Sequence, residues 1–200
     1  MTQSGGVRRA RTEDTRSRLF DAALEAFSRN GFHGTTTRDI AAAAGMSPGA
    51  LYVHHKSKEE LLFLISLAGH ETTLEVVRRG RASSTDPTEQ LVAVVGEFAA
   101  HHARGHVHAR VVNYEHGGLA PEHQPAIREL RREIEATVLG IIEDGVASGQ
   151  FDVDDPAMTA VALLSLGIDV SRWYREEGAW TPEQIGAFYV KLALRIVGAR

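Results

Sequence analysis

The stretch that decides the fold reads GTTTRDIAAAAGMSPGALYVHHKSKEELL and runs from Gly34 to Leu62. Thr36, followed three residues later by Asp39, is typical of a helix N-terminus, because each side chain can cap the other's backbone N–H. Gly45 indicates the end of that helix, since a chain leaving a helix commonly turns through the left-handed conformation. Ser47-Pro48 then begins a second helix. Two short helices joined in this way are typical of a helix-turn-helix, whose second helix enters the major groove of DNA.

The side chains of this stretch suit contact with DNA. Hydroxyl and guanidinium donors gather where the first helix begins, and the dipole of a helix favours phosphate at that end. Small residues follow at the start of the second helix, where they allow close approach, and hydroxyl, imidazole and ammonium groups come within the next two turns. Spacing alone leaves a second interpretation open, a helical hairpin with no role in DNA binding.

The rest of the chain also predicts helices. No stretch alternates apolar and polar residues between turn signals, as a half-buried strand would. Helix starts, apolar faces and glycine stops recur instead, and they predict an all-α fold of about nine helices. The remaining seven are expected at about Thr15 to Arg29, Ser57 to Gly80, Pro87 to Gly105, His106 to His116, Pro121 to Ser148, Pro156 to Glu177, and from Pro182 onward.

Composition excludes several classes of protein. The 200 residues contain no cysteine, which excludes disulfide scaffolds, thiol enzymes and zinc ribbons. The first eighteen residues are polar and charged, unlike a secretory signal. No apolar run reaches the ~20 residues that a membrane span needs. We therefore expect a cytoplasmic protein with no membrane contact.

Charge divides the chain into two parts. Residues 1–58 carry nine Lys or Arg against five Asp or Glu, whereas residues 59–200 carry thirteen against twenty-one. The net charges are therefore +4 and −8, which indicates one part that meets a polyanion and one that does not. We expect a DNA-binding domain at 1–58 and a second helical domain at 59–200.

The last two predicted helices are apolar on more than one side. Ile185, Leu192 and Ile196 share one side of the final helix, and Val190 and Leu194 lie on a largely opposite side. A helix of this kind is buried on several sides. Either the chain's own core or a second subunit would cover the additional surface, and we expect a homodimer.

The residues from Phe32 to Leu62 also carry a family resemblance. They follow F-x-G-T-T-T-R-D-I-A-x-x-A-G-M-S-P-G-A-L-Y-x-H-x-x-S-K-E-E-L-L, and the segment from Leu19 to Phe27 reads LFDAALEAF. Together these segments resemble the DNA-binding domain of the TetR family of bacterial repressors over about fifty residues. His55 departs from the family pattern, which often has an aromatic or aliphatic residue there.

The resemblance implies a dimeric, ligand-responsive repressor that acts on a palindromic operator. It implies three N-terminal helices for DNA, a long connecting helix, and a remainder that binds ligand and dimerises through the last two helices. Arg8, Arg9 and Arg11 could form a minor-groove arm before the first helix, or a solvated tail. The DNA-contact positions that it implies are Thr36, Thr37, Arg38, Pro48, Gly49, Ala50, Tyr52, Val53 and His54, with Lys58 as a clamp on the DNA backbone.

For the effector, the resemblance narrows to one branch of the family. The segment from Arg110 to Glu115 and the residues from Ser171 to Arg175 are similar to regulators of lipid breakdown, which respond to acyl-coenzyme A thioesters. Trp173 could stack on adenine and arginines could meet phosphates, or these groups could be interface and surface residues. We expect a small hydrophobic effector, with acyl-CoA as the specific candidate. The expected ligand residues are Phe98, Arg110, Tyr114, Arg172 and Trp173.

The sequence also offers two other classes of function, an enzyme or metal site and an architectural DNA-binding protein. The histidines 101, 102, 106 and 108 could indicate a metal or an enzyme site, but no carboxylate stands at a partner spacing and Gly105 interrupts them. A helix end that uses imidazoles for hydrogen bonding explains them more simply. The sequence has no phosphate-binding glycine loop or nucleophile elbow. An architectural DNA binder would be basic throughout. We therefore expect no catalysis, no metal and no cofactor.

Overall fold

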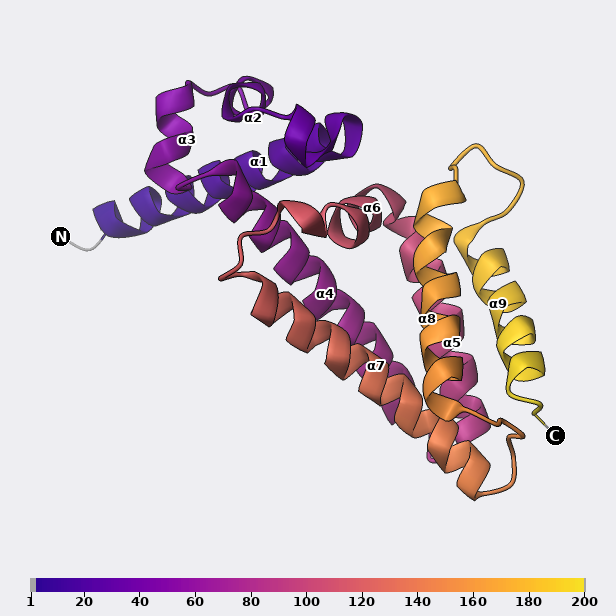
Figure 1. Ribbon diagram of the computed structural model, residues 1–200. Helices are drawn as coiled ribbons and strands as arrows, with labels where there is room; N and C mark the ends of the chain where they lie inside the picture. Colours follow the sequence, from indigo (N-terminus) through magenta and orange to yellow (C-terminus); the bar gives the residue numbers. More distant parts are fainter. Residues whose placement is uncertain (1–2, 200) are drawn as a thin grey trace. The chain divides into compact units, whose positions relative to one another are not determined.

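The computed structural model describes the backbone of residues 3–199 and the side chains of residues 12–199. This part of the chain contains nine α-helices, one short 3-10 helix and no strand, so the predicted all-α fold is confirmed (Figure 1). It divides into two compact units. The first comprises residues up to 67 together with 111–124, and the second comprises 68–110 and the residues from 125 onward.

The helices follow in a simple order. Their bounds are α1 (Gln3–Gly34), α2 (Thr37–Ala43), α3 (Pro48–His54), α4 (Lys58–Ala82), α5 (Pro87–Arg104), α6 (His106–Tyr114), the 3-10 helix η1 (His116–Gly118), α7 (Gln124–Ala147), α8 (Pro156–Trp173) and α9 (Pro182–Ile196).

In the first unit, α1, α2 and α3 pack around a small apolar core. Thr36 and Asp39 form the predicted capping box, and the Ser47 side chain accepts from Ala50 N–H at the start of α3. Gly45 has φ +67°, the left-handed conformation that lets the chain turn between the two helices. Fully buried apolar side chains from several elements fill the centre, namely Leu19, Ala23, Phe27, Ile40, Ala41, Leu51, Leu61 and Leu62.

Several predicted boundaries differ from the structure, among them the starts of α1 and α7 and the end of α8. Helix α1 begins at Gln3, so Arg8, Arg9 and Arg11 lie within it and not in an arm that precedes it; their side chains lie outside the described residues. Helix α7 begins at Gln124 and not at Pro121, because residues 120–123 form a turn. Helix α8 ends at Trp173 and not at Glu177, because Tyr174 leaves the helical conformation with ψ 141°.

In the second unit, α5 packs against both α8 and α9, and its approach to α9 is close. Gly186 of α9 faces the carbonyl oxygen of Gly96 in α5, and a Cβ at Gly186 would lie 2.5 Å from that oxygen. This approach requires a glycine. The core of the second unit combines side chains of α4, α5, α7, α8 and the C-terminal end of α9. Among them are Val77, Leu91, Val94, Ile141, Ile142, Ala160 and Val197, the last of which caps α9.

Candidate DNA-binding face and effector site

The start of α2 and the outer face of α3 form a continuous exposed surface in the first unit, which we call the α2–α3 face. Tyr52 is 57% exposed and Val53 is 79% exposed, although both are large and partly apolar. The hydroxyls of Tyr52 and Thr37 lie 3.2 Å apart and join the two helices at this surface. Exposed apolar groups beside hydrogen-bonding groups are suited to reading base edges in a groove.

The structure brings most of the predicted DNA residues together on this face. Exposed members are Thr36, Arg38, Pro48, Gly49, Tyr52 and Val53, and half-buried members are Thr37, Ala50 and His54. Asp39, which caps Thr36, has a pKa below its ordinary value because the side chain and then the backbone N–H of Thr36 hydrogen-bond to its carboxylate. The cap is therefore ionised at neutral pH and holds the N-terminus of α2 in place.

Lys58 occupies a different position from the other predicted residues. Its Nζ donates to the carbonyl oxygens of Phe32 and Thr35, each at 2.7 Å, and lies 4.3 Å from the centre of the Phe32 ring. Two carbonyl groups at the end of α1 thus receive their hydrogen bonds from this ammonium. The predicted phosphate contact stays a prediction, and Lys58 has a structural role beside it.

His55 lies in the interior directly after α3. It is 5% exposed, and among the described residues neither ring nitrogen has a hydrogen-bond partner. The closest charge is the Glu60 carboxylate, 4.0 Å from Nδ1. Burial lowers the pKa of His55, so the imidazole packs in its neutral form. The departure from the family pattern therefore places a polar ring in a position suited to an apolar one.

Residues 111–124, which run from the last turn of α6 to the first residue of α7, belong to the first unit, and the sequence did not indicate this. The Glu115 carboxylate accepts from Phe32 N–H at 3.0 Å, and the Glu59 carboxylate accepts from Ala120 N–H at 2.8 Å. His123 lies 2.8 Å from the same Glu59 oxygen and stacks on Phe63 with ring centres 4.0 Å apart. Because the partners are distant in sequence, no local pattern could have revealed these contacts.

The predicted effector residues do not converge on one cavity. Phe98 is buried and lines an interior space of about 10 Å³, room for a water molecule at most. Arg172 is exposed and pairs with Asp169 at 3.1 Å. Arg110 is half-buried, and its Nε is buried without a hydrogen-bond partner. Tyr114 is 42% exposed and lies in the segment that packs with the first unit.

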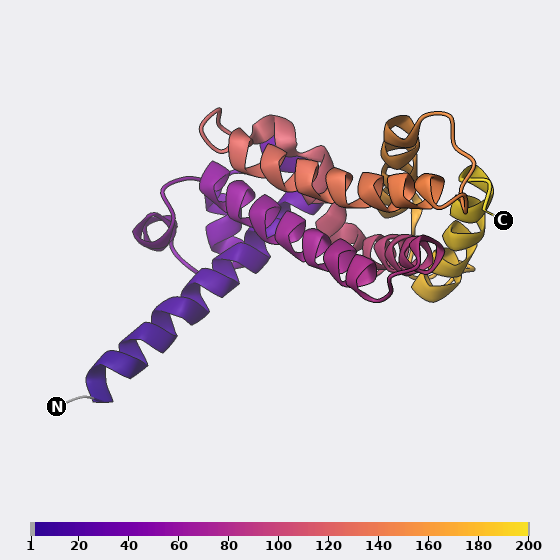
Figure 2. The same cartoon turned by 90° about the horizontal axis from the view of Figure 1, so that it is seen from below.

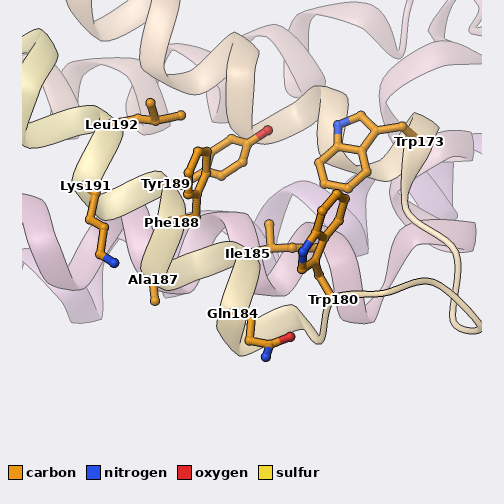
Figure 3. Close-up of a pocket in the computed structure, with 9 residues that line it drawn as sticks. All are labelled: Trp173, Trp180, Gln184, Ile185, Ala187, Phe188, Tyr189, Lys191 and Leu192. Carbon is orange, nitrogen blue, oxygen red and sulfur yellow. The ribbon is translucent and has the colours of Figure 1, made fainter.

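Trp173 lies instead in an apolar groove of about 630 Å³ along α9 (Figure 3). Figure 3 shows Trp173 and Trp180 at one end of this groove, with Leu192 and Lys191 toward the other. Phe188 and Trp180 are 59% and 63% exposed. Burial raises the pKa of the Tyr189 hydroxyl in the same groove. An exposed apolar surface of this extent indicates a binding surface, for a ligand or for another protein chain.

The histidines near the end of α5 form local contacts. His102 Nδ1 lies 2.9 Å from the Phe98 carbonyl oxygen, and His106 Nδ1 lies 3.2 Å from that of Ala103. The His106 ring meets Tyr174 edge-on. Among the side chains that the structure describes, no three His, Cys, Asp or Glu residues are placed to hold a metal ion. Within the described helices, none combines the length and apolar character of a membrane span.

Comparison with known proteins gives matches along nearly the whole chain. The family model "Bacterial regulatory proteins, tetR family" matches residues 19–65, and the model "Tetracyclin repressor-like, C-terminal domain" matches residues 84–197. The transcriptional repressor KstR2 of Rhodococcus jostii is 31% identical over 183 residues, 90% of this chain and 89% of that protein.

Solved structures of other proteins also match nearly the whole of this chain. A tetR-family regulatory protein from Rhodococcus RHA1 is 41% identical, with a TM-score of 0.88 over 93% of this chain and 98% of that one. AibR in complex with isovaleryl coenzyme A and operator DNA has a TM-score of 0.83 over 93% of this chain and 100% of that one. Its identity of 23% shows similarity of fold alone.

Proposed function

Since this chain belongs to the TetR family of bacterial regulatory proteins, we propose that it is a homodimeric transcriptional repressor that leaves a palindromic operator when a small hydrophobic effector binds. The observation that carries the proposal is the α2–α3 face, a helix-turn-helix whose outer residues are exposed and suited to DNA. We place its action in the cytoplasm, where a bacterial operator is found.

For DNA recognition, α3 is the helix that we place in the major groove. Gly49 and Ala50 near its start let the backbone approach the bases, and Tyr52 and Val53 project into solvent one turn later. The valine methyl groups can meet a thymine methyl, and the tyrosine hydroxyl can bond a base edge or a phosphate. Thr36, Thr37 and Arg38 at the start of α2 would hold the phosphates on one side of the groove.

For dimerisation, we propose the outer faces of α8 and α9. Large apolar side chains on both helices remain exposed in one chain, namely Met158, Val161, Leu166, Phe188 and Ile196. A two-fold axis would pair the same surface on both copies and remove these side chains from water. Two copies also supply the two recognition helices that a palindrome requires.

For the effector, an acyl-CoA is the specific candidate. At the end of the groove that lies away from Leu192, the exposed indole of Trp173 can stack on adenine (Figure 3). Arg172 is exposed and pairs with Asp169, and a phosphate could compete with that carboxylate for the guanidinium. AibR, a protein of this fold, holds isovaleryl coenzyme A together with operator DNA in its complex.

Selection of DNA from a random pool by the purified protein tests the proposal. We expect an enriched palindrome with half-site centres about one helical turn, roughly 34–36 Å, or somewhat more apart. Affinity for it should exceed that for a shuffled sequence by at least ~10³-fold at physiological salt. Binding without any enriched sequence would instead indicate an architectural DNA-binding protein.

A further inference from the structure

The contact between α4 and α7 contains one arginine without a counter-charge. Within the second unit these helices lie side by side (Figures 1 and 2). Two arginines of α4 cross this contact to carboxylates of α7, Arg78 to Glu133 and Arg81 to Asp144. Arg131 of α7 reaches back toward α4, but its Nε donates to Nε2 of His70 at 3.1 Å. Among the described residues, no carboxylate pairs with Arg131.

The surroundings of this guanidinium are buried and carry no negative charge. His70 is 3% exposed, and its Nε2 accepts the hydrogen bond, so this imidazole is neutral. His102 of α5 is 2% exposed and lies close to His70, so a positive charge on one of these rings would disfavour a positive charge on the other. Burial lowers the pKa of both Arg131 and His102. The positive charge of Arg131 is therefore partly removed from water without compensation.

The remaining donors of Arg131 are available. A guanidinium has five N–H groups, and its Nε–H is the one that bonds to His70. In the described part of the chain, no acceptor bonds to the four N–H groups on the two Nη atoms. Such a planar pair of nitrogens matches the two oxygens of a carboxylate or a phosphate.

Apolar side chains continue from this site along both helices. Leu74 lies one turn beyond His70 on α4, and Ile127 and Ile134 lie one turn to either side of Arg131 on α7. All three are buried. Leu74 and Ile134 belong to the packed core of the second unit, so the neighbours of Arg131 along both helices are apolar and supply no counter-charge.

We propose that Arg131, positioned by His70, is an anion-binding subsite that receives an oxyanion of the effector. The inference rests on the proposed function, because it assigns a chemical class to the effector of that repressor. It predicts that the effector carries a carboxylate or a phosphate and that a neutral molecule of the same length binds far more weakly.

Calorimetry on the DNA-free protein tests this subsite separately from operator binding. The probes are decanoate, decanoyl-CoA and the neutral decanol, and the variant is Arg131→Gln. The matched control is Arg132→Gln, because Arg132 is the next residue, is exposed and pairs with Glu129 at 2.9 Å. We expect at least one anionic probe to bind the wild type and the control about tenfold or more tightly than Arg131→Gln.

The two anionic probes distinguish the sources of the oxyanion. A selective loss of decanoate binding assigns a carboxylate to Arg131, and a selective loss of decanoyl-CoA binding assigns a phosphate. Binding of decanol should be weak and equal in all three proteins. Equal affinity of every anionic probe for wild type and Arg131→Gln would overturn the proposal, as would the absence of binding by either anionic probe to the wild type.

The stability of the ligand-free protein gives a second, independent measurement. Replacing an uncompensated, half-buried charge by an apolar side chain of similar length should stabilise the fold. Arg131→Met is therefore expected to raise the melting temperature above that of the wild type. A lower melting temperature would show that the hydrogen bond to His70 serves only the fold, and would overturn the assignment. Neither measurement uses DNA, so failure here and failure of the operator prediction are distinguishable.

Discussion

His102 links the stability of the second unit to pH. Burial is the main cause that lowers its pKa from 6.5 to about 4. The hydrogen bond to the Phe98 carbonyl oxygen opposes this shift, and positive charge on His101 or His70 would add to it. Because the folded state favours the neutral ring, its contribution is complete above the ordinary pKa and is lost as the pH falls from 6.5 toward 4. The lost stability amounts to about 3 kcal/mol.

The expected result is a melting temperature that falls steeply between pH 6.5 and pH 4. In His102→Leu the fall should be smaller over the same range, whatever the stability at pH 7.5. His116→Leu, an exposed histidine, serves as control and should keep the wild-type profile. Parallel profiles for wild type and His102→Leu would contradict the assignment of this pH dependence to His102.

Tyr52 and Lys58 should separate DNA recognition from local folding. Tyr52→Ala removes an exposed group of the α2–α3 face and should weaken binding to the selected operator by about 1–3 kcal/mol, with little effect on shuffled DNA. Lys58→Ala removes the donor to Phe32 and Thr35 and should lower the melting temperature. Fluorescence anisotropy and thermal unfolding measure the two effects. Unchanged stability with weaker binding to every DNA would assign Lys58 to phosphate alone.

The prediction about the homodimer interface concerns helix α9. Phe188 and Ile196 lie on its exposed side, two turns apart, with Leu192 half-buried between them. Glutamate at Phe188 and Ile196 would place charge in the proposed interface, so the double variant should be monomeric by light scattering. Leu192→Glu combined with Ile196→Glu should have the same effect.

The control for α9 uses an exposed valine on another helix. Val146 of α7 is 37% exposed, and Val146→Glu should stay dimeric. Circular dichroism on each variant separates loss of the dimer from loss of the fold. A double variant that remains dimeric and helical would place the interface elsewhere.

The coupling between effector and operator concerns the whole molecule. An effector that binds the DNA-free state preferentially must lower operator affinity, and couplings of this kind are usually about 1–3 kcal/mol, or 5- to 150-fold. Operator titrations with palmitoyl-CoA, with palmitate and without either measure it. We expect release by palmitoyl-CoA.

Arg172→Ala should reduce the effect of palmitoyl-CoA and leave the affinity without effector unchanged. The exposed Arg132→Ala is the matched control. Equal release by palmitate would remove coenzyme A from the proposal, and no release by either compound would exclude long acyl chains as the effector.

Local patterns were sufficient to predict the helix-turn-helix. The Thr36–Asp39 capping box, the left-handed Gly45 and the Ser47 cap each depend on neighbours within four residues, so they appear in the structure as expected. Most of the DNA-contact residues that the family resemblance implies share one exposed face of these two helices. The TetR-family fold follows from the same stretch.

Contacts between distant residues could be decided only by packing of the folded chain. Lys58 resembles a surface lysine in sequence, but its ammonium meets carbonyl groups 23 and 26 residues earlier. His70 and Arg131 are 61 residues apart, and neither stands in a pattern that indicates the other. Periodicity gives the face of a helix on which a residue lies, but not which helix that face meets. The caps of α2 and α3 and the glycine turn between them were therefore predictable from the chain, whereas the partners of buried charges follow from how the helices pack.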